Sequence, residues 1–361
     1  MPEVNANFHH QGNDTLDQDA DSPPEKPARD EEEEGEDFQF GKDQDNLKGD
    51  DSSISIDMDQ FNEFTVWGVD TEFGENNEDE RCEIKMAKGV AVSPHGVIAL
   101  VEHALERVYL FDSDGSYQQT AATSEENPDN KHAKLLYPTD ATFTVEGHVA
   151  VSDQSKYVKV FRADGDFIHR FNIKGDEDPA ESKPKAYSIT STTTGHIITG
   201  DIRRKLLAIH EEGDGKSLWI RNIQLEYQPH FLAANVANGR YQILACDWRM
   251  GVVTAVDIER PEEEDDVLFT LDSFSVDGKP GLPKGIACDD GNNIYIAVSR
   301  LDDSGDNKNV FTDTGHIHQY SPTGKFERCI FKGLYHPRGL AWNNGSLFVA
   351  NTRSVVIVNG T

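Results

Sequence analysis

The amino-acid sequence predicts an all-β protein that folds as a six-bladed β-propeller. Short runs of alternating apolar and polar residues indicate strands with one buried face. Asp-Gly, Thr-Gly and Asn-Gly pairs separate many of these runs and supply the positive backbone angles that tight hairpins require. The set of runs and turns recurs six times, and a recurrence near fifty residues is typical of propeller blades.

An acidic segment precedes the repeats. Residues 1–60 contain 19 Asp or Glu and four Lys or Arg, so they carry −15 of the formal net charge of −31. Such a segment cannot bury enough apolar surface to offset the entropy of ordering. We therefore expect residues 1–58 to form a disordered acidic tail and residues 59–361 to form the propeller.

The six units can be followed through the strands that each one contains. In chain order they include VIALVEHALERVYLFDSDGSY from Val97, GHVAVSDQSKYVKVFRADGDFIHRF from Gly147, HIITGD from His196, YQILACD from Tyr241, NIYIAVSR from Asn293 and SLFVANTRSVVIVNGT from Ser346. Another apolar run precedes most of them, as in KGVAV, YPTDATF, QPHFLAA, LPKGIAC and HPRGLAW. Each unit is thus predicted to have four strands, and such sheets bury their faces by packing side by side in a ring.

The last unit stops at Thr361, where its fourth strand should begin. A ring left open there would expose a sheet edge. The strand-like run FNEFTVWGVD, Phe61 to Asp70, precedes the first unit and has no partners of its own. We predict that it pairs with residues 354–358 and closes the ring.

One polar residue follows the second strand of every unit. The six residues are Glu102, Asp153, Asp201, Asp247, Ser299 and Asn351, at intervals of 51, 48, 46, 52 and 52 residues. Carboxylates near the mouth of a central channel could bind a metal ion. Because the position obeys the repeat, we favour turn caps that accept backbone N–H bonds. The sequence accordingly predicts no metal, no cofactor and no catalytic residue.

The loops that break the repeat carry basic and aromatic residues, which suit a partner-binding face. The candidates are Lys156, Tyr157, Arg203, Arg204, Trp248, Arg249, Arg300, Tyr335, His336 and Arg338. A protein partner is favoured over RNA because the chain is strongly acidic, and nucleic-acid binding relies on positive charge. No DNA and no membrane partner is expected.

Several other chemistries find little support. The four cysteines are dispersed, so neither a disulfide framework nor a zinc-binding RING is predicted. No signal peptide or membrane-length apolar run is present, and we expect a cytoplasmic protein. The loop DDSGDNKNVFTD from Asp302 lacks the Gly and final Glu of a calcium loop.

The repeats resemble NHL repeats, as GVAVSPHGVIALVEHALERVYLFDSDGSY and LPKGIACDDGNNIYIAV show. The resemblance covers residues 61–361, and this part of the chain is similar to the C-terminal domain of TRIM-NHL proteins. The segment RPEEEDDV departs from the pattern. It implies a protein-interaction platform, an adaptor or substrate receptor in ubiquitin-dependent regulation without its own RING. Single-stranded RNA binding is the alternative. A metal-dependent lactonase or lyase on a six-bladed propeller is a second alternative.

Overall fold

The computed structural model describes residues 67–73, 82–122, 131–173, 183–213, 216–237, 239–259, 266–301 and 311–360. The predicted acidic tail and most of the insertion that begins at Asp302 lie outside these ranges. The regular structure within them is β-strand throughout, and they include no helix able to cross a membrane. The strands all belong to one unit, residues 52–303 and 309–361.

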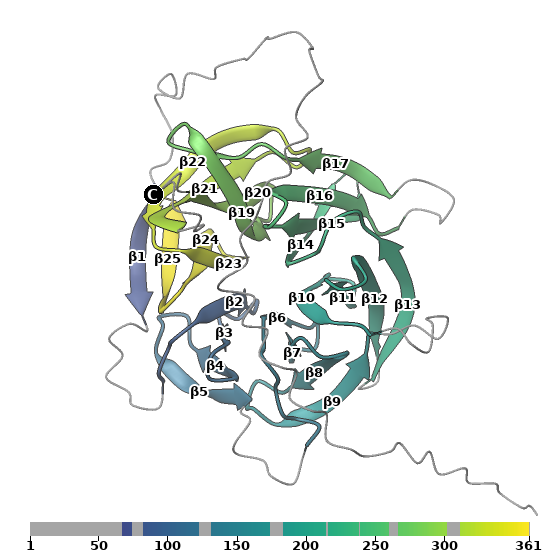
Figure 1. Cartoon of the computed structure of the whole chain (residues 1–361). Coiled ribbons are helices and arrows are strands. Elements are labelled where there is room, and N and C mark those ends of the chain that lie inside the picture. Colours follow the sequence, from purple (N-terminus) through teal and green to yellow (C-terminus); the bar gives the residue numbers. More distant parts are fainter. Residues whose placement is uncertain are drawn as a thin grey trace, which may run out of the picture. The chain divides into compact units, whose positions relative to one another are not determined.

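Six antiparallel sheets form the blades, and their strands are numbered along the chain (Figure 1). Blade 1 contains β2 (Ala87–Val92), β3 (Ile98–Glu102), β4 (Arg107–Phe111) and β5 (Tyr117–Ala122). Blade 2 contains β6 (Asp140–Phe143), β7 (Val149–Ser152), β8 (Tyr157–Phe161) and β9 (Phe167–Asn172). Blade 3 contains β10 (Ala186–Ser191), β11 (His196–Asp201), β12 (Leu206–Gly213) and β13 (Lys216–Gln224).

The remaining blades follow the same order with one addition. Blade 4 contains β14 (Phe231–Ala237), β15 (Arg240–Asp247), β16 (Val252–Asp257) and β17 (Val267–Leu271). Blade 5 adds β18 (Ser275–Val276) to β19 (Lys279–Cys288), β20 (Ile294–Leu301), β21 (Phe311–Tyr320) and β22 (Phe326–Leu334). Blade 6 contains β23 (Pro337–Asn343), β24 (Ser346–Asn351), β25 (Ser354–Gly360) and β1 (Trp67–Phe73). The sequence prediction of a six-bladed propeller is confirmed.

The ring is closed by the pairing of β1 with β25. The strands run antiparallel, with Trp67 opposite Gly360 and Phe73 opposite Val355. The predicted closure is therefore confirmed, and the observed strand extends three residues beyond Asp70. An N-terminal strand thus completes the blade that the C-terminal strands begin.

Each pair of neighbouring blades shares one apolar cluster. Val101 and Leu110 of blade 1 join Val149 and Val151 of blade 2, for example. Corresponding clusters occupy the other five junctions, including the one between blades 6 and 1. Both faces of each sheet are therefore buried against neighbouring blades, which favours folding of the ring as a whole.

The innermost strands of neighbouring blades contact one another all the way round the axis, and β23 contacts β2 (Figure 1). Glycine permits this approach at two places. A Cβ on Gly285 would meet the Arg338 carbonyl oxygen at 2.0 Å, and one on Gly339 would meet the Lys88 carbonyl oxygen at 2.9 Å. The Pro-x-Gly start of these units therefore packs backbones tightly and places the residue between Pro and Gly at the axis.

Candidate functional site

Each blade has one residue that lies within its inner strand or directly before it and that follows the Pro of the repeat or the Ala that replaces this Pro. These six axial positions are Lys88, Thr139, Tyr187, His230, Lys284 and Arg338. They are equivalent in the repeat but differ in chemistry. We call the group they form the axial mouth.

Side-chain contacts link residues across the axial mouth. Lys88 Nζ, from blade 1, lies 5.0 Å from the centre of the Tyr187 ring in blade 3. Because these blades are not neighbours, this contact spans the mouth. The Tyr187 and His230 rings lie 5.3 Å apart, and the His230 and Trp248 rings lie 5.6 Å apart. Lys284 Nζ lies 3.7 Å from the centre of the Trp248 ring, so the contacts continue into blade 5.

Positive charge gathers at the more accessible side of the mouth. Arg249, Lys284 and Arg338, from blades 4, 5 and 6, are half-buried, and we call them the basic patch. Burial and the charges of Arg338, Lys88 and Arg249 hold the pKa of Lys284 well below its usual range. The cations of the mouth therefore repel one another, and an anion placed among them would relieve that repulsion.

A histidine and a carboxylate meet beside the basic patch. His230 Nδ1 lies 3.4 Å from Asp247 Oδ1, and both side chains are buried. Burial lowers the pKa of His230, although Asp247 opposes this shift. Burial acts to raise the pKa of Asp247, but His230 and backbone N–H groups hold it below its usual range. The pair is therefore a neutral imidazole beside a carboxylate, a combination that can move protons.

Asp140 interrupts the repeat next to the mouth. It occupies the position of Gly89, Gly285 and Gly339 in other blades, and its carboxylate accepts hydrogen bonds from the N–H groups of Ala141 (3.0 Å) and Ile189 (3.2 Å). Burial raises the pKa of Asp140 to about 7. Its protonation therefore changes near neutral pH, unlike that of an ordinary carboxyl group.

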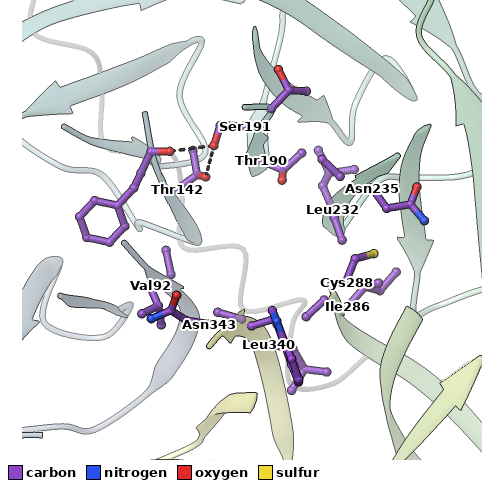
Figure 2. Close-up of a pocket in the computed structure, with 18 of the residues that line it drawn as sticks. Val92, Thr142, Thr190, Ser191, Leu232, Asn235, Ile286, Cys288, Leu340 and Asn343 are labelled. Atoms are coloured by element: carbon purple, nitrogen blue, oxygen red, sulfur yellow. Dashed lines mark hydrogen bonds between the residues drawn. The ribbon is translucent and has the colours of Figure 1, made fainter. Parts of the chain in front are cut away.

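A cavity of about 590 Å³ lies along the axis and is lined by all six inner strands (Figure 2). Asp140 belongs to this lining and directly follows Thr139 of the axial mouth. Other lining residues, labelled in Figure 2, include Val92, Thr142, Thr190, Ser191, Leu232, Asn235, Ile286, Cys288, Leu340 and Asn343. Apolar side chains alternate with small hydroxyl and amide groups, and the carboxyl groups of Asp140, Asp289 and Asp290 also line the cavity, so it does not suit an anion.

The polar residues after the second strands bind backbone in their own turns. Glu102 accepts hydrogen bonds from the N–H of Ala104 (2.9 Å) and from that of Met86 (2.8 Å), which precedes the inner strand. Asp201 and Asp247 accept bonds at 2.9 Å and 3.0 Å from the N–H two residues later. We call Glu102, Asp153, Asp201, Asp247, Ser299 and Asn351 the turn ring. Its carboxylates cap turns, the role that the sequence favoured over metal binding.

Three members of the turn ring have individual surroundings. Asp153 forms a buried ion pair with Lys159 and also accepts the N–H of Leu136 at 2.9 Å. Asn351 Nδ2 lies 3.4 Å from the Ser354 hydroxyl, while Ser299 Oγ is buried without a hydrogen bond among the described residues. Blades 5 and 6 thus have no carboxylate at this position.

The ten predicted partner-face residues divide into separate groups. Those that gather at the axial mouth are Trp248, Arg249 and Arg338, with Tyr335 and His336 in contact with each other at 4.5 Å just before Arg338. Those that lie elsewhere are Lys156 and Tyr157 in blade 2, Arg203 and Arg204 in blade 3, and Arg300, whose charge acts on Asp277 in blade 5.

Two of the predicted residues are engaged by neighbouring groups of the propeller itself. Arg204 donates from Nε to Asp201 at 2.6 Å and from a terminal nitrogen to the Ile173 carbonyl at 3.2 Å. The Tyr157 ring has Lys156 Nζ at 5.1 Å and the Arg170 guanidinium at 4.0 Å. Arg204 therefore stabilises its turn, whereas Arg203 beside it is exposed.

Sequence reasoning missed Lys88, Lys284 and Asp140. The signal was present, because aligning the units on their Pro residues brings Lys88 and Lys284 into register with His230 and Arg338. Lys88 and Lys284 do not stand out in a single unit, because each belongs to an apolar run that reads as a core strand. The same alignment shows Asp140 where other units have Gly.

A divalent metal at the axial mouth does not fit these residues. Lys88, Lys284 and Arg338 would repel a cation there. The carboxylates of the turn ring are already occupied by backbone N–H groups. Within the part of the chain that the structure describes, this mismatch concerns the axial mouth and the turn ring, while Asp140, Asp289 and Asp290 line the cavity beside them.

Comparison with known proteins finds similarity in fold but not in sequence family. No family model and no curated protein sequence matches the chain. Among solved structures it is similar to a gluconolactonase from Xanthomonas campestris, at 12% identity and a TM-score of 0.54 over 77% of this chain and 87% of that one.

Two further structures give the same result. A structural-genomics target assigned as a gluconolactonase has 13% identity and a TM-score of 0.53, with 83% and 94% covered. A catalytically inactive virginiamycin B lyase from Staphylococcus aureus, solved with quinupristin, has 14% identity and a TM-score of 0.50, with 82% and 100% covered. These neighbours are lactonases and a lyase rather than TRIM-NHL proteins. At such identities they establish that the chain is a six-bladed β-propeller with repeated blades.

Proposed function

We propose that this propeller is a protein-recognition module whose basic patch binds an acidic segment of a partner chain. The observation that carries the proposal is the concentration of Arg249, Lys284 and Arg338 beside Lys88, where burial and the neighbouring positive charges lower the pKa of Lys284. Carboxylates of a partner would neutralise this charge and form charge-assisted hydrogen bonds with the two guanidinium groups.

Aromatic side chains around the basic patch suit a protein interface. Trp248 is half-buried beneath Lys284, and Tyr335 is 49% exposed just before Arg338. Tyr, Trp and Arg contribute most of the binding energy in many protein interfaces. The net charge of −31 opposes the long-range approach of RNA and of an acidic peptide alike, so the preference for a protein partner rests on the aromatic side chains around the basic patch. A role in ubiquitin-dependent regulation rests on the NHL resemblance and stays a prediction.

The test uses the full chain and fluorescent peptides of stated composition. Decaglutamate should bind, with an affinity that falls as salt rises, and decaglutamine should not. The double variant Arg249→Gln/Arg338→Gln should weaken decaglutamate binding at least tenfold. Arg203→Gln removes an exposed cation outside the basic patch and serves as the matched control. Equal decaglutamate affinity in the double variant and the control would contradict the proposal, and tighter binding of oligouridine than of decaglutamate would favour RNA.

A lactonase or lyase reaction is the second candidate function. His230 and Asp247 provide a neutral imidazole beside a carboxylate, and two of the similar structures are named for lactone and streptogramin substrates. His230 could take a proton while Asp247 orients the ring. Conversion of gluconolactone or quinupristin by the chain, abolished in His230→Asn, would support this candidate. No conversion by the intact chain would exclude these two substrates.

A further inference from the structure

Two histidines and a cysteine meet on the outer half of blade 5, away from the axial mouth. His316 and His318 belong to β21 and Cys329 to β22. One nitrogen of each imidazole and the Cys329 sulfur all lie within 4.8 Å of one another. Neither the turn caps nor the proposed binding of an acidic segment uses these residues.

The backbone explains why the three side chains converge. His316 and His318 are two residues apart on one strand, so they point to the same face of the sheet. Cys329 lies directly opposite His318 in the antiparallel pairing of β21 with β22. Facing cross-strand positions bring side chains into contact. The cluster is therefore held by two paired strands, whose register shifts between Ile317 and His318, rather than by a loop.

The histidine nitrogens lack the hydrogen bonds that buried polar atoms normally have. His316 is 2% exposed and His318 is 4% exposed. Among the described residues, His318 Nε2 has no hydrogen-bond partner, and His316 Nε2 has a long contact of 3.5 Å with Asp277 Oδ2. The His318 ring instead packs against Phe326, at 5.5 Å between ring centres. A buried nitrogen left without a partner costs free energy, and a bound metal ion would satisfy it.

A fourth potential ligand, a carboxylate oxygen, lies next to this group. Asp277, in the turn between β18 and β19, has Oδ2 at 3.5 Å from His316 Nε2. Its other oxygen, Oδ1, pairs with Lys332 Nζ at 3.1 Å. Asp277 and Gly278 both have positive φ angles, 50° and 74°, which fix a tight turn at this point.

We propose that His316, His318 and Cys329 form a zinc site, with Asp277 next to the remaining coordination position. Two imidazoles, one thiolate and an oxygen are ligands that zinc accepts in tetrahedral geometry. Binding would displace the proton of the Cys329 thiol to solvent and leave the zinc oxidation state unchanged. The ion would tie β21 to β22 and, through Asp277, to the β18–β19 hairpin, so it would act as a structural clamp of blade 5.

A second group of potential ligands provides an internal control. Glu146, His148 and Glu212 also lie within 4.8 Å of one another but are more exposed and include no cysteine. A metal held there would give no sulfur signature. His148→Ala should therefore leave a Cys329-dependent site intact.

The test loads the chelator-treated full chain with Zn²⁺ alone and, separately, with Co²⁺. We expect about one equivalent of zinc at micromolar concentrations, a higher melting temperature with zinc, and a thiolate-to-cobalt charge-transfer band. Cys329→Ser should abolish the band and weaken zinc binding at least tenfold. His148→Ala and Cys288→Ser, the latter a half-buried cysteine outside the cluster, should keep both properties.

The proposal is overturned if the intact chain takes up no zinc, or if the band persists in Cys329→Ser. Far-ultraviolet circular dichroism without metal shows whether each variant folds. His316→Asn, which keeps a small polar group at the site, gives a second reading of zinc affinity should Cys329→Ser misfold. Unchanged zinc affinity in His316→Asn would also overturn the proposal.

Discussion

The turn ring and the axial mouth occupy equivalent positions of the same six repeats, yet the first is mostly acidic and uniform while the second is varied and largely basic or aromatic. Four members of the turn ring remain carboxylates, and each caps its own turn. The axial positions instead contain Lys, Thr, Tyr, His, Lys and Arg. The position that keeps a carboxylate in four of the six units serves the fold, whereas the positions that diverge are those where we propose recognition of a partner.

The two groups also complement each other in charge. Ser299 and Asn351, the turn-ring members without a carboxylate, belong to blades 5 and 6. These blades supply Lys284 and Arg338 to the basic patch. Loss of acid at two ring positions therefore leaves positive charge unbalanced on that side of the mouth.

Both groups depend on a closed ring, so the largest effect should come from opening it. A chain that starts at Lys85 lacks β1 and leaves β25 as an unpaired edge strand. We expect this chain to lose the cooperative thermal unfolding transition of the full chain and to aggregate. A chain starting at Gln60 removes most of the acidic tail but keeps β1, and it should unfold as the full chain does. Equal melting temperatures for the chains starting at Lys85 and Gln60 would disprove closure by β1.

Substitution in the turn ring should have the next largest effect. Asp153→Ala leaves the buried Lys159 ammonium without its carboxylate and the Leu136 N–H without its acceptor. We expect the free energy of unfolding in urea to fall by about 3–5 kcal/mol. The double variant Asp153→Ala/Lys159→Met should recover much of this loss. A loss of less than about 1 kcal/mol, the value typical of an exposed pair, would show that Asp153 has no structural role.

Asp140 should give a smaller effect that depends on pH. Its pKa is raised to about 7 in the folded chain, so the folded state binds more protons than the unfolded state between about pH 4 and 7. Asp140 therefore contributes stability that is present below pH 4 and is lost as the pH rises through 7. Asp140→Asn should gain stability relative to the parent chain over this range, by at least about 1 kcal/mol. A difference between the two chains that is independent of pH would contradict the raised pKa.

Lys284 should affect stability least, although it belongs to the binding site. Lys284→Met keeps a long side chain over Trp248 and removes repulsion with Arg338. We expect the free energy of unfolding to change by less than about 1 kcal/mol, while decaglutamate binding weakens at least tenfold. A large loss of stability in Lys284→Met would place this lysine with the structural residues instead.

The fold could be predicted because its signals are local and repeated. Alternation, turn glycines and the fifty-residue period specify the six blades, and the unfinished last unit specifies closure by a strand near Trp67. The site could be predicted only in part. Trp248 and Arg249 could be predicted because they lie in a loop that diverges, and Arg338 because it follows the Pro that begins an inner strand, but Lys88 and Lys284 lie in strands whose sequences resemble core strands.

The missing part of the site depends on contacts that a linear sequence does not show. Lys88 meets Tyr187 across the axis, from a blade that is not adjacent. The cluster of His316, His318 and Cys329 likewise depends on the pairing register of β21 with β22. Arg204 was a candidate by composition, and only its bonds to Asp201 and Ile173 show that it stabilises its turn.

The central claim, that the basic patch binds an acidic segment, is tested most directly by proton uptake on binding. The pKa of Lys284 is low because the side chain is buried and because Arg338, Lys88 and Arg249 lie near it, so a bound carboxylate should raise it. Calorimetric titration with decaglutamate, in buffers of different ionisation enthalpy between about pH 7 and 10, measures the protons taken up. We predict uptake of part of a proton per peptide in the parent chain and none in Lys284→Met. Binding without proton uptake at any of these pH values, with equal affinity in Lys284→Met, would contradict the account.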